Sequence, residues 1–322
     1  IRAENMAKAK TVMYKRKGNE AIEVENHSFI DLVNGTNSYE QSWFEMIYLI
    51  TLSLDIYGKA FIYSVAGTRG LPAEFRFLAP FAMKPVLNSG MTGISHYEYS
   101  SATGVTRYST EEIIFFKLPN LGNPFDGVAT IKSCENIIEV DNIQSLFQKK
   151  YTLTGGNINE VIISDEIISD EEIERLNQVM EEKHNIESDS TWLLLQKMKY
   201  EKVNSSAKDL DFINGKNATR DEILAKMRVP RILAGLGQNS NRATANAELW
   251  SFIENVVKPF SKFIVDKLNI FIARTYGKEF YIVLEWNDMR DSEQILGEFK
   301  EGLITESEAR TELGWPSDKP TN

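Results

Sequence analysis

Two helical patterns bracket an acidic segment in the middle of the chain. The first is the stretch GVATIKSCENIIEVDNIQSLFQKKYTLTGG, in which apolar residues recur at helical spacing until two glycines end it. It predicts one helix of about 25 residues, roughly 37 Å long. The second pattern runs from about Lys208 to Met227. Together they predict a helical hairpin with the acidic segment at its tip.

The segment at the tip has the pattern of a small βαββ insert. Its parts are the strand EVIIS, a helix opened by the capping box Ser169-x-x-Glu172, and the strands TWLLLQ and KMKYEKV. Residues 160–189 hold eleven acids and two bases, a local net charge of −9 in a chain whose total is −10. Such a surface favours electrostatic docking of a partner, and the alternative that the acids only solvate an exposed helix stays open.

A second informative stretch, KMRVPRILAGLGQNSNRATANAELWSFIENVVKPF, joins the hairpin to a long helix. Pro230 is predicted to end the hairpin helix, because it lacks an amide donor and disfavours helical geometry in the residue before it. GLGQNSN then turns the chain, and the next helix spans about 30 residues with a kink at Pro259. The glycines follow a helix rather than a strand and lack a following Lys-Ser/Thr, so they do not match a phosphate loop. Six bases outnumber two acids between residues 216 and 242.

The first third of the chain has the patterns of a helix and an antiparallel sheet. SWFEMIYLITLSLDIYG predicts a helix that ends at Gly58. Five short segments rich in aromatic and β-branched residues predict strands: KAFIYSV, AEFRFLA, HYEYS, VTRYS and EIIFFKL. The chain opens with a basic arm, which contains Lys8, Lys10, Lys15, Arg16 and Lys17.

Three further elements complete a fold of the α+β class. EFYIVLEWNDM predicts a strand that rejoins the early sheet. SEQILGEFKEG and TESEARTELG predict helices, the second with the capping box Thr305-x-x-Glu308 and a stop at Gly314. WPSDKPTN predicts a loop at the end.

Residue types that carry catalysis are scattered along the chain. His27, His96 and His184 lack the spacing of metal ligands or of a catalytic triad. The single Cys134 forms no internal disulfide, fits a reducing compartment, and is predicted to be a small buried side chain. The most apolar run, WFEMIYLITLSL, is shorter than the about 20 residues that span a bilayer. We predict no enzyme activity, cofactor, bound metal or membrane span. Because the chain begins at Ile1 rather than Met, we expect the natural protein to extend beyond it.

Four strings in this order resemble the portal proteins of tailed double-stranded DNA bacteriophages, in the branch found among long-tailed phages. They are YGKAFIYSV, FDGVATIKS, ILAKMRVPRILAGLG followed by ATANAELWSFIENVVKPF, and GLITESEARTELGWP. The resemblance covers roughly Ser42 to Pro316. It implies a phage-portal-like fold with a wing, a stem, a clip and a crown.

The resemblance divides the chain into seven segments. They are 1–126 as the N-terminal part of the wing, 127–156 and 205–233 as stem helices, 157–204 as the clip, 234–241 as the tunnel loop, 242–290 as the wing with its long kinked helix and return strand, and 291–322 as a short crown-like end.

The implied function is that of a head-tail connector. Its subunits form a ring, usually a dodecamer, at one vertex of the capsid, through which double-stranded DNA is packaged and ejected without sequence specificity. The implied partners are further copies of the chain, the large terminase subunit that acts as motor, the major capsid protein and neck or adaptor proteins, with no membrane. The protein would assemble in the host cytoplasm and reside in the virion, without a cofactor or enzymatic activity of its own.

The resemblance also assigns candidate site residues. The channel-facing residues of the tunnel loop are Gln238, Asn239, Ser240 and Asn241, with Gly235 and Gly237 as its hinge. Polar side chains without charge suit this place, because each cation that neutralises a phosphate adds affinity and hinders sliding. Arg228, Arg231 and Arg242 are predicted either to meet phosphates or to pair between subunits. The docking residues of the clip are Asp170, Glu171, Glu172 and Glu174.

Two alternatives stay open at the level of the sequence. One is a metal-dependent enzyme acting on nucleic acid, which would need acids that converge at strand ends, whereas the acids here gather in one insert. The other is an adaptor or scaffold protein without a channel, which the mass of the assembled particle distinguishes from a ring.

Overall fold

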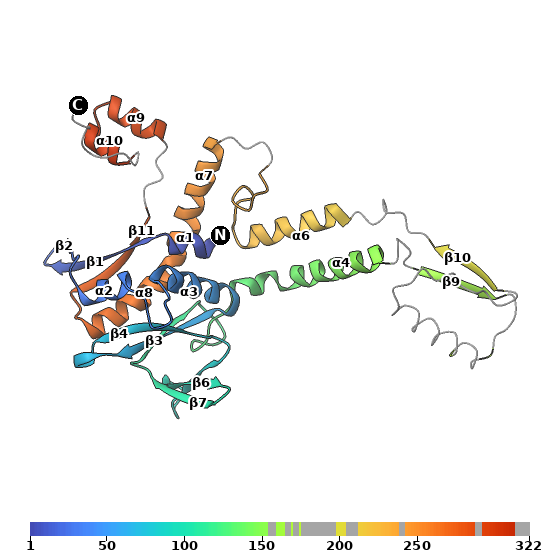
Figure 1. Ribbon diagram of the computed structural model, residues 1–322, viewed down its shortest axis with the longest axis horizontal. Helices are drawn as coiled ribbons and strands as arrows, with labels where there is room; N and C mark the ends of the chain where they lie inside the picture. Colours follow the sequence, from blue (N-terminus) through green and yellow to red (C-terminus); the bar gives the residue numbers. More distant parts are fainter. Residues whose placement is uncertain are drawn as a thin grey trace. The chain divides into compact units, whose positions relative to one another are not determined.

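The computed structural model describes residues 1–153, 159–164, 169, 174, 198–203, 212–237, 242–286 and 292–312 (Figure 1). The chain divides into two compact units. The first contains residues 1–135 and 221–322, and the second contains residues 136–220. The strand pairs of the described residues are all antiparallel, which confirms the predicted α+β class.

Helix α3 (Trp43–Tyr57) lies at the centre of the first unit. A capping box begins it: the Ser42 hydroxyl accepts from the Glu45 N–H, and the Glu45 carboxylate accepts from the Ser42 N–H. The left-handed Gly58 ends it, as predicted. Its buried face includes Met46, Ile47, Ile50 and Leu54. Among the helices that the structure describes, none combines the length and the apolar character needed to cross a membrane.

The five strands predicted after α3 are confirmed, but they belong to two sheets rather than one. The first sheet has the order β4-β3-β8, from Pro72–Leu78, Lys59–Ala66 and Ile113–Lys117. The second has the order β5-β6-β7, from Met83–Leu87, Ile94–Ser101 and Gly104–Ser109. A 3-10 turn, Thr68–Gly70, lies between β3 and β4. The sequence analysis missed β5, which a turn at Pro80 directs away from β4 and into the second sheet.

Side-chain alternation along β3 and β8 explains why the second sheet is needed. Phe61 and Phe115 point to one face, where their rings stack at 4.7 Å and the ring of Tyr97 from β6 meets both at 5.8 Å. Ile62 and Phe116 point to the other face. There they join the main core, the larger cluster of buried apolar residues, which also contains Ile50, Leu54 and Ile264. Both faces of the β3 sheet are therefore covered by apolar contacts.

The N-terminal segment, predicted as a basic arm, is instead helix and sheet. It forms α1 (Arg2–Ala7), β1 (Lys10–Lys17) and β2 (Glu20–Glu23). The predicted return strand is β11 (Phe280–Glu285), but it pairs with β1 in the order β11-β1-β2 and does not rejoin the β3 sheet. Only two residues in the middle of β1 are buried and its basic residues are exposed, so its strand pattern is weak.

A side chain of α8 closes the outer edge of β11. The Asn269 amide donates to the Ile282 carbonyl at 3.1 Å, and its oxygen accepts from the Ile282 N–H at 2.7 Å. These are the two hydrogen bonds that another strand would make at this position.

The long helix predicted after the GLGQNSN turn has three parts. They are α7 (Arg242–Phe252), a π-helical turn (Ile253–Val257) and α8 (Lys258–Thr275). The irregularity predicted at Pro259 is this π-helical turn directly before it. Proline cannot donate to the preceding turn, and a wider turn accommodates the missing bond. The apolar stripe of α8 is buried in the core of the first unit and includes Phe260, Ile264, Leu268, Phe271 and Ile272.

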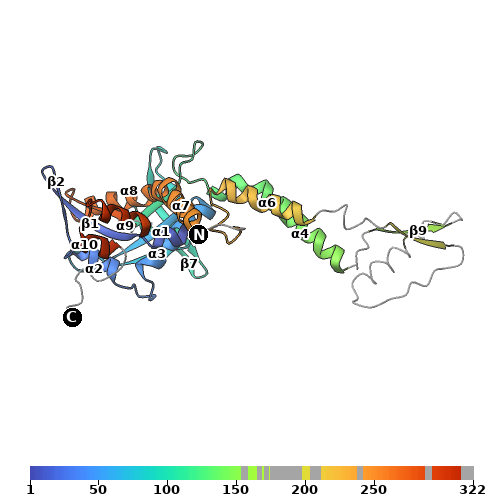
Figure 2. The ribbon, with the colours of Figure 1, turned by 90° about the horizontal axis from the view of Figure 1, so that it is seen from above.

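The hairpin is formed by α4 (Glu135–Leu153) and α6 (Phe212–Lys226), which lie side by side in Figures 1 and 2. The Thr219 hydroxyl of α6 donates to the Asp141 carboxylate of α4 at 3.2 Å. The first helix was predicted as one continuous element, but its beginning is a 3-10 turn, Thr130–Cys134, as is common at helix N-termini.

Two strands of the predicted insert are paired, and the final helices form as predicted. β9 (Asn159–Ser164) and β10 (Met198–Val203) are antiparallel, whereas TWLLLQ lies outside the described residues. Near the C-terminus come α9 (Ser292–Lys300) and α10 (Glu306–Glu312). The capping box of α10 is confirmed by bonds between Thr305 and Glu308 in both directions, at 2.7 and 3.3 Å. Gly314 lies outside the described residues.

Candidate functional site

The hairpin helix α6 ends at an arginine in the left-handed conformation. Arg228 has a φ of 54°. The Val229 N–H bonds the Leu224 carbonyl at 2.8 Å, and the Arg228 N–H bonds the Ala225 carbonyl at 3.0 Å. This pair of bonds is a Schellman motif, whose left-handed position is usually a glycine. Backbone hydrogen bonds therefore end the helix within one residue of Met227, where the sequence predicted its end, and Pro230 follows three residues later, where it prevents the helix from continuing.

Pro230 instead begins a short turn. The Leu233 N–H bonds the Pro230 carbonyl at 3.1 Å, and the Leu236 N–H bonds the Arg231 carbonyl at 3.0 Å. Proline suits the first position of such a turn, because its missing N–H would have no partner there. Gly235 ends the turn with a φ of 75°, a conformation that glycine adopts without steric cost.

Side chains fix this turn to the hydrophobic core of the first unit. Val229 and Leu233 pack against the main core. The Arg231 guanidinium donates to the Asp221 carboxylate at 2.8 Å. Arg231, for which phosphate contact or inter-subunit pairing was predicted, thus has an ion pair within its own chain.

A buried arginine of α1 reaches the same junction. Arg2 donates from Nη1 to Asp55 Oδ1 at 2.5 Å and from Nη2 to the Met227 carbonyl at 2.8 Å. Its guanidinium lies 4.9 Å from the ring centroid of Phe260. Burial raises the pKa of the Asp55 carboxyl, and the positive charge of Arg2 opposes this shift. The end of α6 is therefore tied to α1, α3 and α8 at once.

The predicted channel residues themselves, Gln238, Asn239, Ser240 and Asn241, lie outside the residues that the structure describes. Their flanks are described: Gly237 on one side and Arg242, the first residue of α7, on the other. Arg228 is exposed at the junction.

Of the predicted docking acids, only Glu174 lies within the described residues, where it is helical and exposed. Asp170, Glu171 and Glu172 lie outside them.

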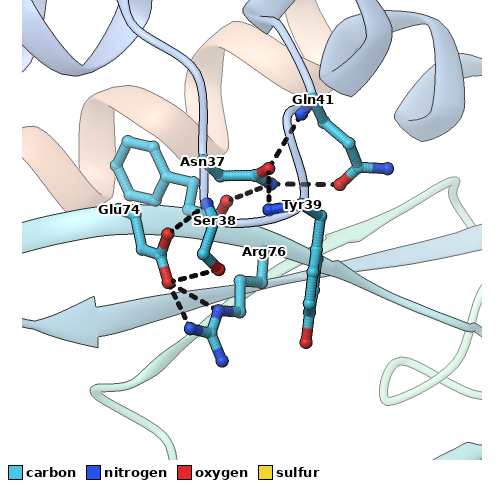
Figure 3. A network of polar contacts seen from close by, with 7 residues as sticks. Asn37, Ser38, Tyr39, Gln41, Glu74 and Arg76 are labelled. Atoms are coloured by element: carbon cyan, nitrogen blue, oxygen red, sulfur yellow. Dashed lines mark hydrogen bonds and ion pairs between the residues drawn. The ribbon is translucent and has the colours of Figure 1, made fainter.

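A polar network lies on the loop between α2 (Ser28–Asn34) and α3, beside a cavity of about 130 Å³ (Figure 3). The Asn37 oxygen accepts from the N–H groups of Tyr39 and Gln41, each at 2.9 Å, and its amide donates to the Phe75 carbonyl at 3.0 Å. These bonds supplement a backbone turn, in which the Glu40 N–H donates to the Asn37 carbonyl at 2.9 Å, and hold the loop on β4.

A carboxylate completes this network. Glu74 accepts from the Ser38 N–H and from Arg76 Nε, both at 2.6 Å. Burial raises the pKa of Glu74, but these bonds outweigh it and leave the pKa below its ordinary value. Both oxygens are engaged in holding the loop, which is a structural role.

The histidines and the cysteine also have structural surroundings. His27 caps α2 by accepting from the Phe29 N–H at 3.1 Å, and burial lowers its pKa. His96 lies 3.4 Å from Glu98, and His184 is outside the described residues. Cys134 is buried, as predicted. In the described part of the chain, no group of three or more His, Cys, Asp or Glu residues is placed to hold a metal ion.

Comparison with protein families identifies the class of this arrangement. The family model described as phage portal protein matches residues 1–314. This chain belongs to the phage portal protein family. The resemblance seen in the four strings is thereby confirmed, and the portal family is structural rather than enzymatic.

Relatives of the portal chain occur in two Rickettsia species. An uncharacterised protein of Rickettsia bellii (strain RML369-C) is 25% identical over 328 residues, which cover 95% of this chain and 82% of the relative. An uncharacterised protein of Rickettsia felis (strain ATCC VR-1525 / URRWXCal2) is 26% identical over 286 residues, which cover 81% of this chain and 71% of the relative.

Solved structures share the portal fold. A chain from the neck of an empty gene transfer agent particle, computed with C6 symmetry, matches with a TM-score of 0.67 and 20% identity, covering 98% of this chain and 88% of that one. An HK97-family phage portal protein from Corynebacterium diphtheriae matches with a TM-score of 0.61 and 12% identity, covering 88% of this chain and 91% of that one.

Two of the four strings meet in the portal chain at a pair of glycines. A Cβ on Gly127 would lie 1.9 Å from the carbonyl oxygen of Gly58. The segments YGKAF and FDGVATIK therefore touch backbone to backbone, which a side chain at Gly127 would prevent. The sequence displays both glycines but does not show that they meet.

The anchors of the junction were also missed. Val229 and Leu233 are apolar residues spaced by four in the segment before GLGQNSN, and this spacing is the signal that could have found them. Arg2 carries no such signal, because it precedes a run of exposed basic residues and looks like one of them.

Proposed function

We propose that this chain is the subunit of a portal ring, through which double-stranded DNA enters and leaves a phage-type capsid. Membership of the portal family over residues 1–314 is the observation that carries the proposal. In this proposal, the segments of the chain that were predicted as wing, stem, clip, tunnel loop and crown serve as those parts of the portal subunit. Terminase docks on the clip, and capsid and neck proteins surround the ring.

An exposed apolar stripe on α4 supports a ring. Four aliphatic side chains on this helix are strongly exposed: Val140 at 45%, Ile143 at 58%, Leu146 at 67% and Leu153 at 74%. At 3.6 residues per turn they fall within a sector of about 140°, which also holds the exposed Glu139, on the side away from Asp141, which contacts α6. Exposed apolar stripes of this kind mark interaction surfaces. In the proposal, the same hairpin of the neighbouring subunit covers it, in a heterologous contact that closes into a ring.

The flanks of the 238–241 segment support its proposed place in the channel. The turn before it is fixed to the core, and a helix follows it directly. In the proposal, Gln238, Asn239, Ser240 and Asn241 form the polar lining of the channel. Repeated around a ring, that surface bonds to passing DNA without neutralising phosphates, which keeps the barrier to sliding low.

The proposal is tested by adding charge to the loop. Asn239→Lys with Ser240→Lys adds two cations per subunit, so packaging and ejection should slow most at low salt, while assembly is unchanged. Packaging is measured over a range of ionic strengths in particles assembled with the variant.

The matched control is Thr103→Lys with Thr106→Lys, two exposed positions on the β6–β7 hairpin that add the same charge. The control should package like the wild type at every salt concentration. Wild-type rates in the loop variant would reject the tunnel-loop assignment while leaving family membership intact.

A further inference from the structure

The end of α6 depends on a cation that comes from the other end of the sequence. Met227 contributes one of the last carbonyls of α6, which the helix itself leaves without an N–H partner. Arg2 supplies that partner at 2.8 Å, from 225 residues away in the chain. A positive charge at a helix C-terminus is also favoured by the helix dipole.

The same guanidinium is held in place by two other groups. Asp55 of α3 accepts from Nη1 at 2.5 Å, and the Phe260 ring of α8 lies beneath the cation at 4.9 Å. Arg2 and Asp55 are both buried. Only the planar, forked guanidinium can meet a carboxylate, a carbonyl and a ring face together, so lysine cannot reproduce this set of contacts.

We propose that Arg2 is a positioning residue for the portal chain: it fixes the end of α6 and the 228–236 turn to the wing core. The positioning role of Arg2 is inferred from these contacts alone. Only the expected effect on DNA packaging rests on the proposed channel function. The N-terminal helix thus acts as a strut between the core and the segment that leads to the proposed channel loop.

Removing Arg2 alone would leave Asp55 charged and buried, which is strongly destabilising and uninformative. The test therefore uses Arg2→Met with Asp55→Asn, which removes both charges and keeps an oxygen at position 55 for the Thr130 hydroxyl. Replacing a buried ion pair by neutral groups is often close to neutral for global stability. The unfolding midpoint in urea should therefore remain near that of the wild type.

Amide hydrogen exchange of the full chain is the primary readout. The amides of residues 228, 229 and 231–236 should exchange about tenfold faster in the double variant, because a charge-assisted bond to their anchor is lost. The amides of residues 50–54 in α3 should be unchanged. Arg2→Lys keeps the positive charge but loses the forked guanidinium, so its exchange rate at residues 228–236 should lie between those of the wild type and the double variant.

The matched control is Trp286→Phe, which removes another hydrogen bond to α1, from the Trp286 indole to the Asn5 carbonyl at 2.7 Å. It should leave exchange at 228–236 unchanged. Wild-type exchange there in the double variant would overturn the inference, as would an equal increase in the control.

DNA packaging by particles carrying the double variant separates this inference from the proposed function. Faster exchange at residues 228–236 together with altered packaging supports both the positioning role of Arg2 and the proposed channel function. Faster exchange with wild-type packaging supports the positioning role of Arg2 and counts against the channel role of the loop that follows.

Discussion

Arg228 has a left-handed backbone conformation, which is sterically unfavourable for a residue with a Cβ. The left-handed conformation costs a residue with a Cβ about 1 kcal/mol or more, and glycine is the usual occupant of this position in a Schellman motif. Its side chain is exposed. A strained residue retained at a helix end, beside a proposed DNA path, suggests that the side chain serves function rather than folding.

We therefore expect Arg228→Gly to leave the free energy of unfolding unchanged or to raise it by up to about 1 kcal/mol. If Arg228 faces phosphates, the variant ring should retain double-stranded DNA with a shallower dependence on salt. Urea unfolding and DNA retention at several salt concentrations measure the two effects. Arg228→Lys is the control, because it keeps both the strain and the charge. A clear loss of stability in the glycine variant would show instead that the side chain is structural.

At the scale of elements, strong periodic patterns predicted the structure well. The α3 pattern with its glycine stop, the five strands after it and the capping box of α10 are all present. Local patterns could not reveal the partners of each strand, since β11 pairs with β1 from the opposite end of the sequence. β1 itself was not predicted as a strand, because its exposed basic residues outnumber its two buried apolar residues, Val12 and Met13.

The candidate site was less predictable than the elements around it. Gly235 was singled out for the backbone freedom of glycine and not for a positive φ, and the arginine at the end of α6 broke the expected rule that glycine or proline ends a helix. The contacts of Arg2 join segments remote in sequence, and no local pattern encodes such contacts. Sequence alone thus indicated where the junction lies but not what holds it.

The apolar stripe of α4 makes a prediction about assembly. Ile143→Glu places a charge in the proposed subunit contact, so it should shift the protein from rings toward monomers, with little effect on the stability of the monomer because this side chain is exposed. Native mass spectrometry of wild type and variant at matched concentrations measures the shift.

Val105→Glu is its control, because Val105 is similarly exposed, at 60%, but lies on β7 in the other unit. It should leave ring formation intact. Rings of unchanged mass and stability in Ile143→Glu would show that α4 does not form the contact, and a wild-type protein that remains monomeric at high concentration would favour an adaptor without a channel.

On the scale of the whole molecule, charge is divided along the sequence. Residues 160–189 carry a net charge of −9, whereas six bases and two acids lie between residues 216 and 242. A strongly acidic segment on every subunit of a ring would make a continuous negative collar. Such a collar raises the association rate of a basic partner and weakens with salt.

Reversing three of these acids tests the proposed docking surface. Glu171→Lys, Glu172→Lys and Glu174→Lys together should weaken binding of the terminase motor by about tenfold or more at low salt, while rings still form. Binding of purified motor to assembled rings is measured as a function of salt. Loss of the ring itself would mean that these acids hold subunits together instead.

The bonds from Asn269 to Ile282 have a consequence for a chain that is proposed to assemble from many copies. An unpaired strand edge is a template on which other chains can add, and it leads to fibres rather than to closed particles. One side-chain amide occupies the donor and the acceptor of β11 at this point. A further strand therefore finds no free partner at Ile282, which hinders strand-to-strand aggregation along this edge and leaves subunits to associate through other surfaces.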